Sequence, residues 1–272
     1  VSSKVRNQYE ENPYPRWRYC NQLFSIDFEK DVNIQIKPNK IKFVNKTDKL
    51  NILLAGCGTG KHLMSVGMYK NSNVLAIDLS LNSLAYAKRK VIENGYKNIK
   101  FLHSDILDLR KLDQTFDHIE CVGTLHHMNN PDDGFKSLLK VSKPGGLLRL
   151  GLYSDLARQD VIKLREIVKS KNFKPIMDDI RALRKFILSE NETSGLFNSI
   201  FMRDFYSTSD IRDLLFHVHE QRYTIPKLIK NFRDFNLEFL GFVHNDFVKY
   251  QYSKLFPNDK EMINLEYWNE FE

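Results

Sequence analysis

The sequence predicts an α/β protein with a mostly parallel, seven-stranded sheet, helices on both faces and a helical insertion after the fifth strand. The main observation is a regular alternation of apolar, strand-like runs with helical patterns from residue 51 to residue 152. Such alternation implies parallel strands joined by right-handed crossovers. A second observation is a glycine-rich turn, Gly56-Cys57-Gly58-Thr59-Gly60, between the first strand and a helix. A turn of this kind directs backbone N–H groups and the positive end of a helix toward a ligand.

Each element has its own local signal. Short apolar runs predict five strands, at 51–55, 73–77, 99–103, 116–122 and 147–152. A helix at 81–94 follows the N-cap residue Ser80 and repeats apolar residues at spacings of three and four. Another helix begins at Asn130-Pro131. Beyond the fifth strand four helical patterns follow, and then apolar runs at 237–243 and 247–254 predict two closing antiparallel strands.

This pattern divides the chain of 272 residues, of which 42% are apolar, into three parts. Residues 1–48 form an N-terminal arm that either packs its aromatic side chains on the core or closes over a ligand as a lid. Residues 49–153 and 236–272 form the core, which contains the sheet. Residues 154–235 are a helical insertion, well placed to act as a substrate cap over the strand ends.

Polar side chains follow the ends of successive strands. Asp78 follows the second strand, Asp105 follows the third, and His126 and His127 follow the fourth. Because the carboxyl ends of parallel strands meet at one edge of a sheet, we expect these residues to converge on one ligand site. An acid at the position of Asp78 can accept hydrogen bonds from both ribose hydroxyls of a nucleoside.

About a hundred residues carry a set of motifs in one order: the glycine turn, Asp78, Ser104-Asp105-Ile106, Gly123-Thr124-Leu125-His126-His127 and Lys143-Pro144-Gly145-Gly146. Their identity and order resemble the class I S-adenosylmethionine-dependent methyltransferases. The resemblance implies a Rossmann-like fold, S-adenosylmethionine as cofactor and S-adenosylhomocysteine as product. The chain departs from the family at Leu54, two residues before the first glycine, where the family usually has an acid that often supports the glycine loop.

The resemblance also implies a role for each part of the cofactor site. The glycine turn contacts the methionine part of the donor, Asp78 contacts the ribose, and Asp105 with Ile106 contacts the adenine. The full set of implied cofactor-binding residues is Gly56, Cys57, Gly58, Thr59, Gly60, Asp78, Leu79, Ser80, Asp105, Ile106, Gly123 and Thr124.

A second resemblance concerns the arm and the insertion. The segment Tyr9-Glu10-Glu11-Asn12-Pro13-Tyr14-Pro15-Arg16-Trp17 resembles one in a subgroup of these enzymes, some of which are fused to tetratricopeptide repeats. The likeness extends to Asp204-Phe205-Tyr206-Ser207 and to residues 214–223. It implies an acceptor pocket lined by Arg16, Trp17, His126, His217 and Arg222, although the same segments are also suited simply to packing the cap.

Methyl transfer from a sulfonium is an in-line displacement, so the protein mainly orients the reactants and excludes water. A general base helps only when the acceptor is protonated at neutral pH, and His127 is the candidate because imidazole titrates near neutrality. Tyr14, Tyr153 and Tyr206 are candidates for acceptor contacts, and their aromatic faces can also hold a sulfonium. The spacings of the histidines do not predict a metal site.

Composition leaves the acceptor open. The net charge of +7 and the pI of about 9.1 admit a nucleic-acid partner. Protein and small-molecule acceptors rank ahead of RNA, because no dense Lys/Arg cluster is interleaved with aromatic residues and no Asn-Pro-Pro-Tyr motif follows the fourth strand. No apolar run is long enough for a membrane span, no signal peptide is visible, and three cysteines without metal spacing favour a cytoplasmic protein.

Two other functions remain open. The first is a non-catalytic protein that binds the cofactor or its product for regulation or interaction. The second is a nicotinamide-dependent oxidoreductase, against which Lys61 argues, because this lysine stands where the third glycine of the dinucleotide fingerprint would fall.

Overall fold

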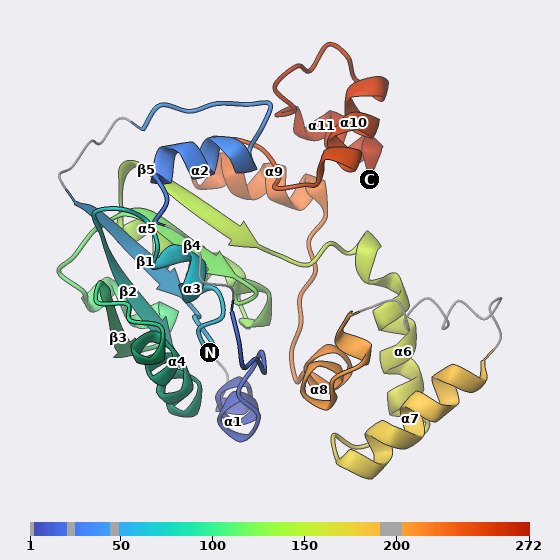
Figure 1. The fold of residues 1–272 in the computed structure, drawn as a ribbon. Helices are drawn as coiled ribbons and strands as arrows, with labels where there is room; N and C mark the ends of the chain where they lie inside the picture. The colour runs from blue at the N-terminus through green and yellow to red at the C-terminus, as the bar shows by residue number, and fades with distance from the viewer. Residues whose placement is uncertain (1–2, 21–24, 44–48, 191–202) are drawn as a thin grey trace.

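The computed structural model describes residues 3–20, 25–43, 49–190 and 203–272. Within these ranges a single parallel sheet holds five strands in the order β3-β2-β1-β4-β5 (Figure 1). The strands are β1 (Leu50–Ala55), β2 (Ser72–Asp78), β3 (Ile99–His103), β4 (Phe116–Val122) and β5 (Ser142–Gly151). The direction of the strand order reverses between β1 and β4, and ligands of open α/β sheets bind at such a switch point.

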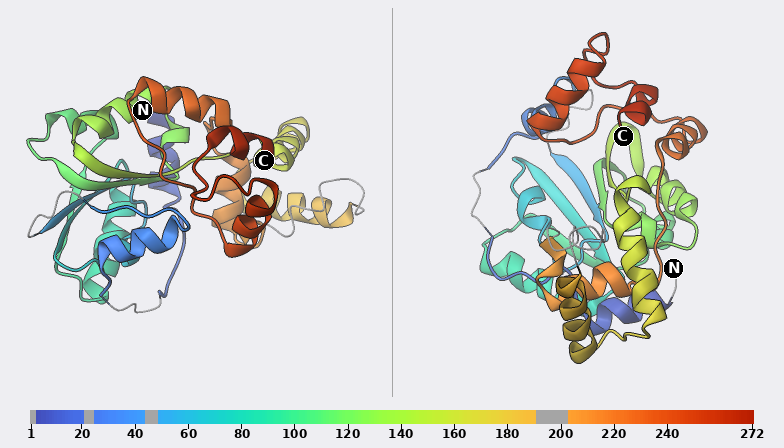
Figure 2. Two further views of the ribbon diagram at one scale, coloured as in Figure 1. Left: turned by 90° about the horizontal axis from the view of Figure 1, so that it is seen from above. Right: turned by 90° about the vertical axis from the view of Figure 1, so that its right-hand side faces the viewer.

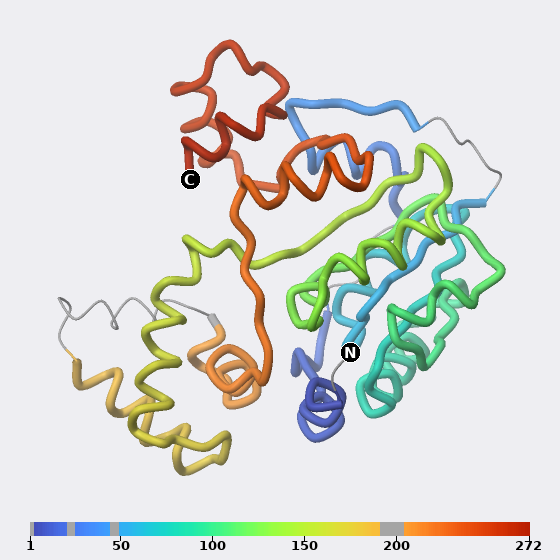
Figure 3. Tube along the Cα trace, turned by 180° about the vertical axis from the view of Figure 1, so that it is seen from behind, coloured from blue at the N-terminus to red at the C-terminus, as the bar shows by residue number. Residues whose placement is uncertain are grey.

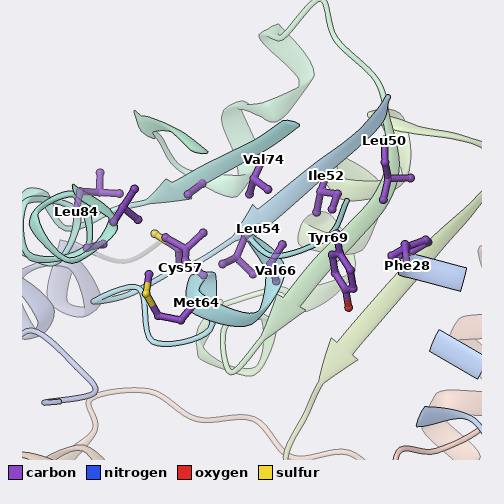
Figure 4. Close-up of a cluster of buried hydrophobic side chains, with 14 of the residues drawn as sticks. Phe28, Leu50, Ile52, Leu54, Cys57, Met64, Val66, Tyr69, Val74 and Leu84 are labelled. Atoms are coloured by element: carbon purple, nitrogen blue, oxygen red, sulfur yellow. The ribbon is translucent and has the colours of Figure 1, made fainter. Parts of the chain in front are cut away.

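Helices cover both faces of the sheet (Figure 2). On one face lie α2 (Phe28–Gln35), α3 (Leu63–Val66) and α4 (Leu81–Glu93). Figure 4 shows their shared apolar cluster, in which Leu54 of β1 lies near Val66 of α3. The other face carries η1 (Ile106–Lys111) and α5 (Pro131–Lys140), whose Phe135 is fully buried. The helices expected at 81–94 and at Asn130-Pro131 are confirmed, and side chains of Ser80 and Asn130 cap them as predicted.

The insertion after β5 forms a helical unit with its own apolar core. Its helices are η3 (Leu156–Arg158), α6 (Gln159–Ser170), α7 (Met177–Ser189), η6 (Arg203–Phe205) and α8 (Thr208–Phe216). Leu164, Leu183 and Ile211 meet in its centre and are almost fully buried. Because this cluster is separate from the two clusters on the sheet, the insertion packs largely on itself (Figure 3).

The chain then returns to the sheet through α9 (Ile225–Asp234), which is followed by α10 (Asp246–Leu255) and α11 (Leu265–Phe271). These three helices gather around Tyr252 and Trp268, whose rings stack 4.1 Å apart. At the other end of the chain, α1 (Ser3–Glu11) lies between α4 of the core and α8 of the cap (Figure 1). No helix in the described ranges is both long and apolar enough to cross a membrane.

The prediction of seven strands is wrong: the described sheet has five. Residues 237–243 form no regular strand, and residues 247–254 lie within the helix α10. Their aromatic residues raised the strand propensity, but tertiary packing overrides it. The Asn245 side chain accepts a hydrogen bond from the N–H of Val248 and so caps α10, while Phe239 stacks on Phe232 of α9. The carbonyl of Leu240 accepts a hydrogen bond from the Asn39 side chain.

Candidate active site

The glycine loop connects β1 to α3 at the switch point of the sheet. Gly56, Gly58 and Gly60 all have positive φ, at 77°, 52° and 83°. Glycine adopts such backbone angles at little cost, so the loop follows from its composition. The N–H groups of Gly56 and Cys57 both donate to the carbonyl of Ile77 at 2.9 Å, which fastens the start of the loop to the end of β2.

Asp78 joins the glycine loop to the end of β2. One carboxylate oxygen accepts from the N–H of Gly58 at 2.7 Å, and the other accepts from the N–H of Ser80 at 2.9 Å. Burial raises the pKa of Asp78, and these N–H groups oppose that shift in part. A carboxylate has more lone pairs than these two N–H groups occupy, so Asp78 keeps acceptor capacity for a ligand hydroxyl.

Asp105 and Thr124 follow β3 and β4. The Asp105 side chain accepts from the N–H of Leu107 at 2.9 Å, and the next residue, Ile106, is buried. A Cβ atom added at Gly56 would collide with the Thr124 side chain, so these two loops lie against each other at the switch point. The structure therefore brings the predicted groups after β1, β2, β3 and β4 to one edge of the sheet.

The N-terminal arm lies directly on the glycine loop. The N–H of Thr59 donates to the carbonyl of Tyr14 at 3.1 Å, and the Thr59 hydroxyl donates to the carbonyl of Pro15 at 2.5 Å. The indole N–H of Trp17 lies 3.2 Å from both the carbonyl and the hydroxyl oxygen of Thr59. Thr59 is thus the point at which the arm is held to the loop.

Glu10 fastens the arm to a second place, the start of α4. Its carboxylate accepts from the N–H groups of Leu81 at 2.8 Å and Asn82 at 3.0 Å, and from the Ser80 hydroxyl at 3.2 Å. A carboxylate at a helix N-terminus satisfies free N–H groups and complements the helix dipole. Burial opposes the ionised form, yet the N–H groups of Asn82 and Leu81 lower the pKa of Glu10 overall.

Three histidines, from the loop after β4 and from the end of α8, form a buried cluster. His126 stacks on Tyr153 with ring centroids 3.8 Å apart, and His127 stacks on His217 at 3.6 Å. Burial lowers the pKa of His126 to about 2, that of His127 to about 4 and that of His217 to about 2. All three rings are therefore neutral at pH 7.

His127 has a defined tautomer. Its Nδ1 lies 2.8 Å from the carbonyl oxygen of His219, which can only accept a hydrogen bond. In the neutral ring Nδ1 therefore carries the proton, and Nε2 carries the lone pair. His127 can accept a proton at Nε2.

Tyr9 of α1 and Asp213 of α8 extend this cluster. The Tyr9 hydroxyl donates to the Asp213 carboxylate at 3.0 Å, and it also lies 3.1 Å from Nε2 of His217. The N–H of His219 donates to Nδ1 of His217 at 3.1 Å, so Nε2 of the neutral ring donates to Tyr9. Burial raises the pKa of Asp213 to about 7. The arm, the cap and the loop after β4 thus share one hydrogen-bonded chain.

An ion-pair cluster from the cap supports the same side chains. Arg158 and Arg165 both bind Glu220, at 2.5 Å and 2.8 Å, and the Glu220 side chain is 2% exposed. The guanidinium of Arg158 also lies 3.9 Å from the ring centroid of Tyr153. Tyr153 is therefore held between Arg158 and His126, and burial raises the pKa of its hydroxyl to about 12.

Five of the expected acceptor residues make no described side-chain contact with this cluster. Arg16 is exposed, and Trp17 packs in the apolar core in an edge-to-face contact with Tyr86. Tyr206 is 72% exposed, and Arg222 forms an ion pair with Asp155 at 2.8 Å. Tyr14 is partly buried beside the glycine loop, and burial raises the pKa of its hydroxyl.

The sequence reasoning missed Tyr9 and Asp213 as members of the site. Asp213 carries a weak signal, because it stands next to the apolar residues Leu214 and Leu215 on the buried side of a helix. Glu120 was missed as well, although an acid within the apolar run 116–122 is unusual for a buried strand.

Residues 52–146 match the family model described as "Methyltransferase domain". The match gives residues 52–146 the character of a methyltransferase domain, and the parallel α/β sheet agrees with the S-adenosylmethionine-dependent, Rossmann-like type. The sequence-based prediction of that class is confirmed.

Individual proteins are similar to this chain in sequence or in fold. An uncharacterised protein of Synechococcus is 34% identical over 119 residues, which is 43% of this chain and 28% of that protein. The "Putative methyltransferase YqeM" of Bacillus subtilis is 28% identical over 183 residues, 66% of this chain and 69% of that protein. PKMT2 from Rickettsia typhi, solved in complex with AdoHcy, superposes with a TM-score of 0.64 at 22% identity and shows a shared fold.

The coverage of these proteins is partial. The superposition includes 93% of this chain but only 52% of PKMT2. The chain thus spans about half of PKMT2 and, at 28%, less than a third of the Synechococcus protein.

The residues at the sheet edge fit the cofactor of this class. Asp78 retains free acceptor lone pairs at the end of β2, where a ribose binds in this fold. The glycine loop has no Cβ at three positions of positive φ, so its backbone is open to close approach by a ligand. Asp105 and Ile106 lie after β3, one strand beyond Asp78.

Proposed function

We propose that this chain transfers a methyl group from S-adenosylmethionine to a protein or small-molecule acceptor, at the edge of the sheet where the arm and the cap meet it. The observation that carries the proposal is the junction of two sets of groups. Asp78 and the glycine loop lie at the switch point, and Tyr9 reaches from the arm beside them to the histidine cluster. A cofactor site and a set of proton-handling side chains thus share one edge.

The donor-binding residues are those that the family resemblance implies. Asp78 accepts hydrogen bonds from the ribose, Asp105 and Ile106 contact the adenine, and the loop from Gly56 to Gly60 holds the methionine part. Cys57, Leu79, Ser80, Gly123 and Thr124 complete the wall of the site. When bound, the donor supplies a methyl group on a positively charged sulfur that is also the leaving group.

The acceptor side consists of Tyr14, His126, His127, Tyr153 and His217. His127 accepts a proton from the acceptor at Nε2, since its Nδ1 is committed to the carbonyl of His219. Tyr153 and His217 orient the acceptor and exclude water, because each stacks face to face on a histidine of the loop after β4. In this proposal residues 154–235 are the acceptor cap and residues 1–48 are the arm that closes the site.

The wider assignments belong to the same proposal. The segment from Tyr9 to Trp17 supports membership in the subgroup that is sometimes fused to tetratricopeptide repeats, because this segment makes the contacts with the glycine loop. Cys20, Cys57 and Cys121 are free thiols, which suits a reducing, cytoplasmic location.

A second candidate is a protein that binds the donor or its product without transfer. The tight packing of the histidine cluster favours this second candidate, because His126 is fully buried and His127 is 5% exposed. Their faces are already covered by Tyr153 and His217. Under this candidate the acceptor side stays closed.

Calorimetric titration with S-adenosylhomocysteine tests the cofactor assignment, with NADH as the control ligand. We expect binding of the first ligand only. Asp78→Asn should weaken it by about 1.5–3 kcal/mol, the value of hydrogen bonds to a charged group. Asp108→Asn is the matched control, because the Asp108 side chain is 46% exposed and pairs only with Lys111 among the contacts described. Equal affinities in the Asp78 variant and the control would remove the assignment.

Transfer itself separates the two candidates. A labelled methyl donor is incubated with the protein and with cell extract, divided into protein and small-molecule fractions. Label that enters either fraction, and is lost in His127→Ala with donor affinity unchanged, supports transfer with His127 as the base. Tight binding of S-adenosylhomocysteine without label in any fraction supports the second candidate.

A further inference from the structure

A buried acid on β4 stands beside the position at which the chain lacks one. β1 and β4 pair in parallel, with Leu54 in register with Glu120. Residues in register point to the same face of a sheet, so the Glu120 side chain lies on the face that Leu54 shares with α3. Glu120 is fully buried. A carboxylate is therefore present at the level of Leu54, one strand away.

Three cationic or potentially cationic side chains surround Glu120. Nε2 of His118 lies 3.0 Å from Oε1, Nε2 of His62 lies 2.9 Å from Oε2, and the Arg149 guanidinium lies 3.7 Å from Oε2. Burial opposes ionisation, but the contacts with His118 and His62 hold the pKa of Glu120 well below its ordinary value. The contact of Oε2 with His62 is a close ion-pair approach rather than a well-aligned hydrogen bond among the described residues. Glu120 is a buried, ionised carboxylate at neutral pH.

His118 fixes this carboxylate to the sheet. Its Nδ1 lies 3.1 Å from the carbonyl oxygen of Leu147 on β5, while its Nε2 faces Glu120. The ring thus bridges a carbonyl oxygen of β5 and the carboxylate of β4. The position of the Glu120 carboxylate is thus set from the side of β4 and β5.

His62 brings the same carboxylate to the glycine loop. It is the N-cap residue of α3, two positions after Gly60, and its side chain is 28% exposed. The backbone N–H groups of Ser65 and Val66 donate to the His62 carbonyl, so the residue is also tied into the helix. Gly56 and Cys57 hold the start of the loop on β2, and Thr59 holds its middle on the arm. The contact between His62 and Glu120 holds its exit.

We propose that Glu120 is a positioning residue for the glycine loop and acts through His62. Leu54 supplies no carboxylate for this task. A loop of glycines has many accessible conformations, and a ligand that binds its N–H groups pays for ordering it unless side chains order it beforehand. This inference rests on the proposed function, since it takes the loop to hold the methionine part of the donor.

The test uses His62→Gln, Glu120→Gln and their combination in the intact chain. The measurements are the affinity for S-adenosylhomocysteine, the hydrogen exchange of the amides from residue 56 to residue 66 without ligand, and the thermal midpoint. We expect each single variant to lose about tenfold in affinity, because the close contact between His62 and the Glu120 carboxylate no longer orders the loop, and to exchange faster in this segment. The double variant should lose little more than either single one.

Arg149→Gln is the matched control, because Arg149 approaches the same carboxylate from β5 and touches no residue of the loop in the contacts described. It should leave loop exchange and affinity as in the wild type. Should Glu120→Gln fail to fold, His62→Gln still decides, because it leaves Glu120 paired with His118 and Arg149.

The inference is overturned if His62→Gln has the same loop exchange, the same affinity and the same thermal midpoint as the wild type. Additive losses in the double variant overturn it as well, because they mean that the two residues act independently. Absence of S-adenosylhomocysteine binding in the wild-type chain instead counts against the proposed function. In that case the exchange measurement alone still decides whether Glu120 orders the loop.

Discussion

Asp213→Asn changes a buried carboxyl group in the chain that links the arm to the cap. Asp213 is 6% exposed and accepts a hydrogen bond from the Tyr9 hydroxyl. Burial raises its pKa to about 7, against about 4 for an aspartate in an unfolded chain. Asparagine keeps a side-chain oxygen that can accept from Tyr9, so the substitution removes the titration and preserves the shape.

The difference of about three pKa units corresponds to about 4 kcal/mol. The folded chain holds the Asp213 proton more tightly than the unfolded chain, so folding is favoured at low pH. The free energy of unfolding therefore declines as the pH rises from about 4 to about 7, and the full loss is reached above the folded pKa. Asp213→Asn has no such decline. Relative to the wild type, it should gain up to about 4 kcal/mol between the two ends of this range.

Urea denaturation followed by tryptophan fluorescence at about pH 5 and about pH 8 captures about 2.5 kcal/mol of this gain, because about one pKa unit of the decline already lies below pH 5. Both chains contain His126, His127 and His217, so the effect of these histidines largely cancels in the difference between them. Asp178→Asn is the control, because this aspartate of the same cap is 89% exposed. A stability difference between Asp213→Asn and the wild type that is the same at both pH values would refute the reasoning.

Three further substitutions test the arm, the loop and the histidine cluster. Gly58→Ala places a Cβ 2.6 Å from the carbonyl oxygen of Tyr14, whereas Gly95→Ala meets nothing within 4 Å at a similarly positive φ. In urea denaturation Gly58→Ala should therefore lower the free energy of unfolding by at least about 1 kcal/mol more than Gly95→Ala. Equal losses would show that the arm moves away without cost. Glu10→Gln removes the carboxylate at the start of α4 and should cost about 1 kcal/mol at neutral pH. Because the pKa of Glu10 is lowered on folding, this loss should fade in acid, and a pH-independent loss would contradict the charge argument. His126→Leu removes a ring whose nitrogens form no hydrogen bond within the described residues and whose pKa is lowered to about 2; the stability lost between about pH 7 and pH 5 should shrink by about 2 kcal/mol, and an unchanged acid loss would rule out His126 as its source.

Local patterns in the sequence were sufficient to predict the strands and helices in the central part of the fold. The apolar runs at 99–103 and 116–122 coincide with β3 and β4, and Ser80 caps α4 as expected. These features depend on neighbours within a few residues, through strand alternation, helix periodicity and capping. The rule that carboxyl ends of parallel strands share one edge then placed Asp78 and Asp105 together.

The same local signals misled at the C-terminal end. The aromatic residues from Phe247 onward predict a strand. The cap at Asn245 and the burial of Tyr252 against Trp268 instead make this segment helical. A strand in this segment would need a pairing partner from a distant part of the chain. A few neighbouring residues do not reveal which distant segment packs against them. Propensity is a weak prior wherever tertiary contacts decide.

By itself the sequence determined the order of the elements, the glycine loop and the class of cofactor that these motifs resemble. Only the tertiary structure decided which side chains meet: Tyr9 with Asp213, 204 positions apart, and His62 with Glu120 across two elements. The physical reason is that hydrogen bonds and ion pairs act over a few ångströms in space and carry no trace in sequence spacing. The groups that order the loop and close the site were therefore found through contacts rather than through motifs.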